Sequence, residues 1–308
     1  MNINVIIPTF NRARELESAL NSILKQTLLP SEVIIIDQSE NTATKDLVES
    51  FDRTNQSCGV RFIWHYQREK GSAKARNVGA RLAKGEIICF TDDDVVLQEN
   101  YFAALKSYFD KYSHIGGICG NVEVPNPPSG FKWFLRRLLL RVFLIDFGNG
   151  KMTPSGFGFP IFQREIEGLT YVELVAGYSM NFRRQFIEND MFDEFFTGYS
   201  FREDVELSYR ISRKTQLALI PEARFQHNTS PTNRINLEPL KRMQFRNYYY
   251  VFNKHRNVSW VSLVLFGYSI FGILFMGFVE WLFGFKKKKW DCFASDASAV
   301  LQLIRGEL

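Results

Sequence analysis

Short apolar runs alternate with helical patterns along the first 95 residues of the chain. Runs rich in Ile and Val predict strands at residues 4–7, 32–36, 60–64 and 86–90. Between them, apolar residues at helical spacing predict helices at 12–25, 42–52 and 72–84. Strands rich in Ile and Val and joined by helices are typical of a parallel sheet buried on both faces. The pattern predicts an α/β fold with a mostly parallel central sheet flanked by helices.

Polar residues follow three of these strands. Pro8 and Thr9 come after the first strand, Asp37 after the second, and the Asp-Asp-Asp segment 92–94 after the fourth. Because ligands of a parallel sheet bind at the carboxyl ends of its strands, we expect these side chains to converge on one rim. Adjacent carboxylates repel one another unless a cation lies among them, and oxygen ligands suit Mg²⁺ and Mn²⁺. The sequence predicts a divalent metal site, with an ordinary acidic turn as the alternative.

The segment 131–143 has an amphipathic pattern of another kind. Projected as a helix, it separates cations from most of its apolar residues. The apolar face holds Phe131, Phe134, Leu135, Leu138, Leu139 and Val142, and the basic face holds Lys132, Arg136, Arg137 and Arg141. Core-facing helices usually carry acidic as well as basic residues on the wet side. An interfacial membrane helix is therefore predicted, and a core helix is the alternative.

Residues 258–279 form a run without a charged side chain. The run is long enough to cross a bilayer. Basic residues flank it on both sides, at 254 and 256 and at 286–289, so charge gives it no orientation. We expect a tilted, re-entrant or in-plane helix in the cytoplasmic leaflet, and a single crossing stays open.

Composition narrows the class of protein. The net charge of +5 comes from three basic segments, 132–141, 241–256 and 286–289, and the rest of the 308 residues is net acidic. Cations beside apolar segments indicate anionic lipid or a phosphorylated acceptor and argue against nucleic acid. Neither a glycine-rich dinucleotide loop nor a Walker-type loop follows the first strand, which argues against a dinucleotide oxidoreductase and a P-loop nucleotidase. Four cysteines without metal spacing and no leader pattern predict reduced thiols in a cytosolic setting.

A series of motifs, in order between residues 3 and 230, resembles family 2 glycosyltransferases. The first half has Val-Ile-Ile-Pro-Thr-Phe-Asn-Arg at 5–12, Gly-Ser-Ala-Lys-Ala-Arg-Asn-Val-Gly at 71–79 and Phe-Thr-Asp-Asp-Asp at 90–94. The second half has Gly-Tyr-Ser-Met-Asn-Phe-Arg-Arg at 177–184, Glu-Asp-Val-Glu-Leu-Ser-Tyr-Arg at 203–210 and a late His227. The resemblance implies a GT-A (Rossmann-like) domain over 1–240, with a nucleotide-binding half (1–95) and an acceptor half (96–240) that contains the 131–143 helix. Residues 241–308 would form a basic, apolar, membrane-associated helical region.

The resemblance also implies roles for individual residues. Asp94, Asp92 and His227 would bind Mn²⁺ or Mg²⁺. Asp204 would be the general base, and Glu203 would orient it or contact the acceptor. The nucleotide-sugar donor would be held by Pro8, Thr9, Asp37, Gly71, Arg76, Asn77, Asp92 and Asp93.

Several of these assignments have a structural alternative. In the structural alternatives, Asp37 is a turn or cap residue, Arg76 is a surface residue, and His227 is a capping or core histidine. An acidic pair such as Glu203 and Asp204 at the start of a helix also stabilises the helix through its dipole.

The expected activity is inverting, metal-dependent transfer of a sugar from a UDP-sugar, or from a dTDP-sugar, to a lipid-linked glycan on polyprenyl diphosphate. Residues 244–248 resemble the Gln-x-x-Arg-Trp motif of processive members but lack its Trp, which favours transfer of a single sugar. Such an enzyme of polysaccharide or cell-envelope synthesis would lie at the cytoplasmic face of the inner membrane, as a peripheral or monotopic protein. The alternatives are a polyprenyl-phosphate glycosyl synthase, a noncatalytic sugar-nucleotide-binding membrane partner and a nucleotidyltransferase.

Overall fold

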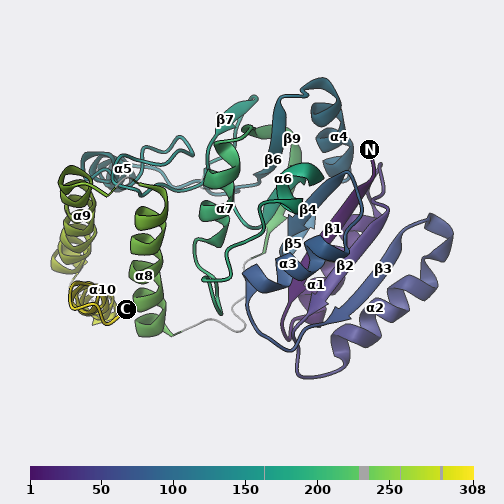
Figure 1. Ribbon diagram of the computed structural model, residues 1–308, viewed down its shortest axis with the longest axis horizontal. Helices are drawn as coiled ribbons and strands as arrows, with labels where there is room; N and C mark the ends of the chain where they lie inside the picture. Colours follow the sequence, from purple (N-terminus) through teal and green to yellow (C-terminus); the bar gives the residue numbers. More distant parts are fainter. Residues whose placement is uncertain (163, 229–235, 257, 285–286) are drawn as a thin grey trace. The chain divides into compact units, whose positions relative to one another are not determined.

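The computed structural model describes residues 1–308 except 163, 229–235, 257 and 285–286 (Figure 1). The chain divides into two compact units, one of residues 1–127 with 161–232 and one of residues 128–160 with 233–308. Lys286, the first residue of the predicted basic cluster at 286–289, lies outside the described residues.

The first half of the first unit is a parallel sheet. Its strands are β1 (Ile3–Thr9), β2 (Glu32–Asp37), β3 (Arg61–Tyr66) and β4 (Ile87–Thr91), in the order β3-β2-β1-β4. The connecting helices are α1 (Ala13–Leu24), α2 (Ala43–Thr54) and α3 (Ser72–Leu82), with a 3₁₀ turn, η1, at Gln56–Cys58. All four predicted strands and all three predicted helices are confirmed within a few residues.

The rest of the first unit extends the same sheet with mixed directions. Its strands are β5 (Val95–Leu97), β6 (Ile115–Val122), β7 (Thr170–Val172), β8 (Ser179–Arg183) and β9 (Gln216–His227). Strand β8 runs antiparallel to both β4 and β6, β6 and β9 are parallel, and β5 and β7 pair antiparallel with β9. The helices are α4 (Tyr101–Lys111), α6 (Arg184–Glu188) and α7 (Glu203–Ser212). The sheet is thus parallel as far as β4 and mixed beyond it.

The second unit consists of helices and one long connection. Its helices are α5 (Phe131–Val142), α8 (Leu237–His255), α9 (Trp260–Gly284) and α10 (Lys287–Ile304). Helix α10 packs against both α8 and α9, and an ion pair of 2.9 Å joins Lys241 Nζ to Asp296 Oδ1. The sequence assigned the 131–143 helix to the first domain, whereas the structure groups α5 with the C-terminal helices. The physical reason is a set of contacts with α9, which include an Arg136–Glu280 ion pair.

Candidate active site

The acidic segment that follows β4 is anchored to the end of β1. Oγ1 of Thr9, the last residue of β1, donates a hydrogen bond of 2.8 Å to Oδ2 of Asp93. Arg12 Nη1 lies 3.2 Å from the other carboxylate oxygen of Asp93 and 3.6 Å from Oδ2 of Asp94. Burial raises the pKa of Asp93 to about 7, against the hydrogen bond from Thr9 and the charge of Arg12. The contacts of Asp93 are therefore internal, and they hold the segment in place.

Strand register brings His227 to the same segment. Strand β5 pairs with β9 so that Val95, the residue after Asp94, faces His227. His227 Nε2 lies 3.1 Å from Asp94 Oδ1, and one ligand atom each from Asp92, Asp94 and His227 lies within 4.8 Å of the others. Burial lowers the pKa of His227, but the hydrogen bond to Asp94 and the charge of Asp92 outweigh burial and raise it. Carboxylate oxygens with an imidazole nitrogen suit Mn²⁺, so the three predicted metal ligands fit a divalent ion.

Arg76 joins this cluster to the second acidic motif. Its side chain is 3% exposed, which contradicts the surface alternative. Nη2 lies 2.8 Å from Oδ1 of Asp92, and Nη1 lies 2.5 Å from Oε1 of Glu203. Burial raises the pKa of Glu203 to about 8, against the opposing charge of Arg76. One guanidinium group therefore bridges two carboxylates that are 111 positions apart in the sequence.

The protein thus supplies countercharges of its own to the acidic residues. Arg12 pairs with Asp93 and Asp94, and Arg76 pairs with Asp92. Sequence reasoning assigned this neutralisation to a metal ion alone and gave Arg12 no role. The available signal was the position of Arg12, three residues after the end of β1, on the rim where the carboxylates converge.

Asp204, the candidate base, lies in the first turn of α7. Its Oδ2 accepts the backbone N–H of Gly177 at 2.9 Å, and its Oδ1 accepts the N–H of Val205 at 2.8 Å. Burial raises the pKa of Asp204, while these two hydrogen bonds lower it less strongly. A raised pKa brings a carboxylate toward the range in which a general base works. Neighbouring Glu203 points to Arg76 and so does more than stabilise the helix dipole.

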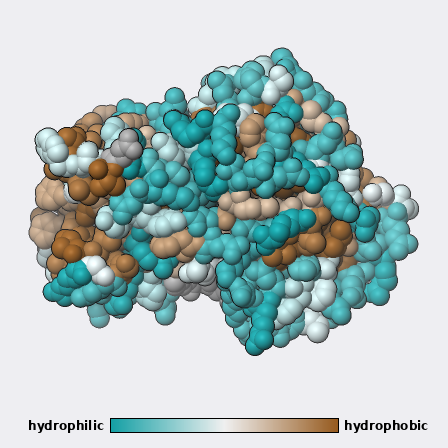
Figure 2. Space-filling model, in the orientation of Figure 1, coloured by the Kyte–Doolittle hydropathy of each residue, from teal (hydrophilic) through white to brown (hydrophobic). Residues whose placement is uncertain are grey.

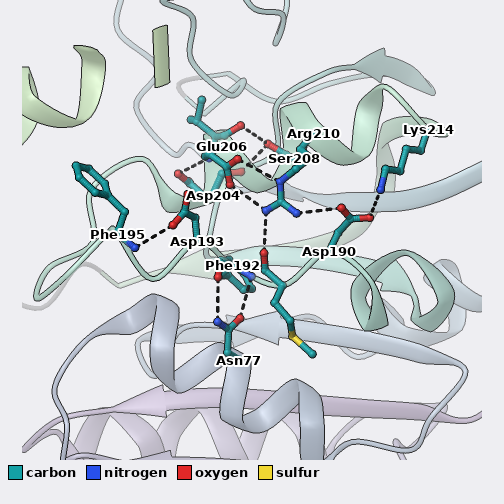
Figure 3. Close-up of polar contacts among 12 residues, drawn as sticks. Asn77, Asp190, Phe192, Asp193, Phe195, Asp204, Glu206, Ser208, Arg210 and Lys214 are labelled. Atoms are coloured by element: carbon teal, nitrogen blue, oxygen red, sulfur yellow. Dashed lines mark hydrogen bonds and ion pairs between the residues drawn. The ribbon is translucent and has the colours of Figure 1, made fainter. Parts of the chain in front are cut away.

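Figure 3 shows how α7 is attached to the segment 190–196. Arg210 of α7 lies 3.0 Å from Asp190 Oδ1 and 3.0 Å from Glu206 Oε2. Asn77 of α3 donates to the carbonyl of Phe192 at 2.9 Å and accepts its N–H at 2.8 Å. The sequence assigned Asn77 to the donor, whereas in the structure its amide fixes this segment. The helix that carries the candidate base is thereby linked to α3.

The remaining predicted donor residues lie on the same rim. Thr9 and Asp37 are paired in the β1–β2 register, next to the pair Pro8 and Ile36. Asp37 is 1% exposed and accepts hydrogen bonds of 2.9 Å from the Ser39 N–H and 2.9 Å from the Trp64 indole. It therefore also forms the turn that its structural alternative describes.

Gly71 is the residue directly before α3. Its φ of 146° is rarely adopted by residues with a side chain, and its backbone forms a parallel bridge with Gly198. The Gln38 side chain contacts the Gly71 carbonyl at 3.3 Å. The observed neighbour of the Gly71 backbone is therefore Gly198, and a role of Gly71 in holding the donor stays a prediction.

Comparison with known sequences supports the resemblance to family 2 glycosyltransferases. The family model described as Glycosyl transferase family 2 matches residues 4–170. GalNAc(5)-diNAcBac-PP-undecaprenol beta-1,3-glucosyltransferase of Campylobacter jejuni is 30% identical over 118 residues, which is 38% of each chain. Validoxylamine A glucosyltransferase of Streptomyces hygroscopicus subsp. limoneus is 25% identical over 240 residues, or 68% of this chain and 47% of that protein. The matches thus span less than half of either relative's length.

Solved structures share the fold. Residues 1–349 of TarS from S. aureus, in complex with UDP-GlcNAc, match 98% of this chain and 81% of that chain with a TM-score of 0.61 and 14% identity. The mannosyltransferase PcManGT from Pyrobaculum calidifontis, in complex with GDP-Man and Mn²⁺, matches 100% and 88% with a TM-score of 0.59 and 15% identity. The predicted α/β, GT-A architecture is confirmed.

Proposed function

The chain belongs to glycosyl transferase family 2, and from that premise we propose an inverting, metal-dependent glycosyltransferase that moves one sugar from a nucleotide-sugar to a membrane-held glycan. The observation that carries the proposal is the Arg76 bridge. It joins Asp92 of the candidate metal group to Glu203, the neighbour of the candidate base Asp204. The proposed sites for the leaving group and for the acceptor hydroxyl would thereby be held together in one unit.

Asp92, Asp94 and His227 would hold Mn²⁺ or Mg²⁺. When bound, the ion offsets the charge that develops on the diphosphate as the bond between the sugar and its leaving oxygen breaks. Arg12 contributes further positive charge beside Asp93 and Asp94, and its fixed contacts keep the segment ordered before the donor binds.

Asp204 would take the proton from the acceptor hydroxyl. Direct displacement by that oxygen inverts the anomeric centre and requires no covalent intermediate on the protein. The Gly177 and Val205 N–H groups fix the carboxylate in one orientation, and burial keeps its pKa raised. One correctly oriented base therefore suffices for the acceptor side of the reaction.

The donor and acceptor follow from chemistry and from the relatives. TarS is in complex with UDP-GlcNAc and PcManGT with GDP-Man, and we propose a UDP-sugar for this chain, with a dTDP-sugar as the alternative. The Campylobacter jejuni relative is named for an undecaprenol-diphosphate acceptor. The exposed apolar side chains of α5 and α9 support an acceptor of that class, held at the cytoplasmic face of the cell membrane. A polyprenyl-phosphate glycosyl synthase is the second candidate.

The test combines the full chain, Mn²⁺, a panel of nucleotide-sugars and a lipid extract, with free nucleoside diphosphate as the readout. We expect release that depends on the extract and disappears in Asp204→Asn, while donor affinity is kept. Asp110→Asn is the matched control, because Asp110 is an exposed acid on α4.

Each alternative has its own outcome in this assay. Donor binding without release in the wild-type chain would indicate a noncatalytic partner. Production or consumption of pyrophosphate would indicate nucleotidyl transfer. Purified polyprenyl phosphate acting as acceptor in place of the extract would indicate a lipid-phosphate synthase.

A further inference from the structure

Helix α9 exposes apolar side chains along one face, where the Phe143 ring covers part of Tyr268, Phe271 and Phe275. Among the described residues it is the one helix long and apolar enough to cross a membrane, and 22% of its most apolar window is buried. Exposed residues recur every three or four positions along one face, as a helical stripe requires. They are Val264, Tyr268, Phe271, Phe275, Phe278 and Leu282. Figure 2 shows hydrophobic side chains at the surface of this unit. Exposed rows of this length mark an interaction surface.

Helix α5 is attached to the middle of α9. Gly272 is the central residue of α9, and a Cβ placed there would lie 2.3 Å from the Phe143 ring, which follows α5 directly. Ser269 Oγ donates a hydrogen bond of 2.7 Å to the Phe143 carbonyl. Nearer the end of α9, Glu280 pairs with Arg136 at 2.7 Å. Helix α5 therefore runs antiparallel to the second half of α9, and Phe143 packs against the middle of α9.

Charged groups accompany this attachment. Arg141 lies two residues before Phe143, and Arg137 pairs with the buried Asp146 at 2.7 Å. On the opposite flank of α9, Gly277 lies near Asp296, which pairs with Lys241. Charged residues thus lie beside the second half of α9, Asp296 near Gly277 and Arg136 at Glu280.

We propose that α9 lies in the plane of the membrane, inserts its apolar stripe into one leaflet of an anionic bilayer and does not cross it. Helix α5 inserts beside it through Phe131, Phe134, Leu138 and Val142, all of which are exposed. This placement rests on the proposed function, because a membrane-held acceptor is the reason to choose lipid as the partner of the exposed apolar residues.

Geometry decides between the two orientations. A crossing α9, about 37 Å long, would place Gly272 near the midplane of a hydrocarbon core of about 30 Å. Phe143 would bring its sequence neighbours Arg141 and Asp146 into the hydrocarbon core, and each ion near the midplane costs about a hundredfold in partitioning. In the plane, Arg141 lies at headgroup depth, where it attracts anionic lipid.

The first experiment maps topology in the full chain, with Cys58→Ser and Cys292→Ser as background because Cys89 and Cys119 are buried. Ser259→Cys and Lys288→Cys, made separately, place a thiol before and after α9. An impermeant maleimide is applied to spheroplasts and to inverted membrane vesicles of the expressing cells. Labelling of both thiols in inverted vesicles alone supports the in-plane helix. Labelling of one thiol in each preparation, or absence of the chain from the membrane fraction, overturns it.

The second experiment measures binding to vesicles of phosphatidylglycerol and phosphatidylcholine by cosedimentation. Val264→Glu combined with Leu282→Glu, both at exposed positions without a ring contact to Phe143, should reduce the partition coefficient about tenfold for each residue. Leu82→Glu, the same change at an exposed position of α3, should leave it unchanged. Unchanged partitioning of the double variant contradicts the proposal. Because Asp204→Asn should abolish transfer without affecting partitioning, failure of this inference is distinguishable from failure of the proposed function.

Discussion

Strand β1 in the first unit and helix α9 in the second are both apolar and nearly uncharged, yet they have opposite surroundings. Val5, Ile6 and Ile7 of β1 are fully buried, whereas Val264 and Phe271 of α9 are more than half exposed. Burial of apolar surface in water is favourable by about 25 cal/mol per Å². Exposure on this scale is therefore stable only where another phase or partner covers the helix. Composition alone does not distinguish a buried apolar element from an exposed one, whereas the elements packed around it do.

The charges of the two units differ in the same way. The first unit gathers Asp92, Asp93 and Asp94 in one place and neutralises them with buried or half-buried arginines. The second unit places its cations beside exposed apolar residues, as on α5. The first arrangement suits a charged ligand that enters from water, and the second suits a lipid surface. The experiments below test whether the two units can be perturbed independently.

The largest effect is expected for Asp94→Ala in the first unit. Loss of this ligand should reduce kcat/KM about a thousandfold, because a bound metal supplies several kcal/mol of transition-state stabilisation. Mn²⁺ binding to the unloaded protein, followed by electron paramagnetic resonance, should weaken in parallel. Vesicle binding should not change. Normal turnover and normal Mn²⁺ affinity in Asp94→Ala would exclude Asp94 as a metal ligand, and Asp110→Ala is the control.

Arg76→Lys should have the next largest effect. Lysine keeps the charge but lacks the fork that reaches Asp92 and Glu203 together. We expect about a hundredfold loss of kcat/KM and about 3 kcal/mol lower free energy of unfolding, because an ammonium that reaches one carboxylate leaves the other without its countercharge. Denaturant unfolding and initial rates measure these quantities. Arg81→Lys, an exposed arginine on the same helix, serves as control, and equal behaviour of the two variants would deny Arg76 its bridging role.

Much of the first unit was predictable because local patterns decide it. Strands such as 32–36 are rich in Ile and Val, and a polar residue at the end of such a strand lies at the carboxyl edge of the sheet. The grouping of Asp92, Asp94 and His227 followed from motif order, and the β5–β9 register supplies its physical cause.

The contacts that were missed are those between distant residues. Asn77 pairs with Phe192, and Arg12 pairs with Asp93, through a fold that no local pattern describes. The grouping of the 131–143 helix with the C-terminal helices was not predicted for the same reason, because its partner Gly272 is more than a hundred positions away. The amphipathic pattern of a helix predicts which of its faces is apolar but does not predict which element that face packs against.

The pH dependence of transfer probes the base directly. Because burial raises the pKa of Asp204, the acid limb of kcat/KM should have its midpoint above 3.8, the usual value for Asp. A base must be ionised, so the rate falls about tenfold for each pH unit below that midpoint. The profile should be measured at saturating Mn²⁺. A midpoint that moves with the Mn²⁺ concentration would assign the limb to the metal ligands instead.

Gly272→Ala tests the attachment of α5 in the second unit. The new Cβ would overlap the Phe143 ring, so we expect a loss of about 2 kcal/mol in unfolding free energy. Gly267→Ala on the same helix meets no atom within 4 Å and should be neutral or slightly stabilising. Thermal unfolding in detergent compares the two variants. Equal stabilities would show that α5 is not seated on α9, and metal-dependent donor binding should be unaffected in both.

The smallest effects are expected at two adjacent arginines of α5, and their order is informative. Arg136 and Glu280 are each about half exposed, so Arg136→Ala should cost less than about 0.5 kcal/mol and vary with salt. Arg137 pairs with Asp146, whose side chain is 6% exposed, and its removal leaves a buried carboxylate with the Gly148 N–H as a remaining donor. Arg137→Ala should therefore cost about 1 kcal/mol or more, with little dependence on salt. Denaturant unfolding at low and high ionic strength measures both variants. The reverse order would mean that the Asp146 contact does not hold the connection after α5.

The charge-reversed triple variant of Arg136, Arg137 and Arg141 to Glu should lose binding to anionic vesicles through misfolding of α5 as well as through repulsion, and circular dichroism of the same samples separates the two causes.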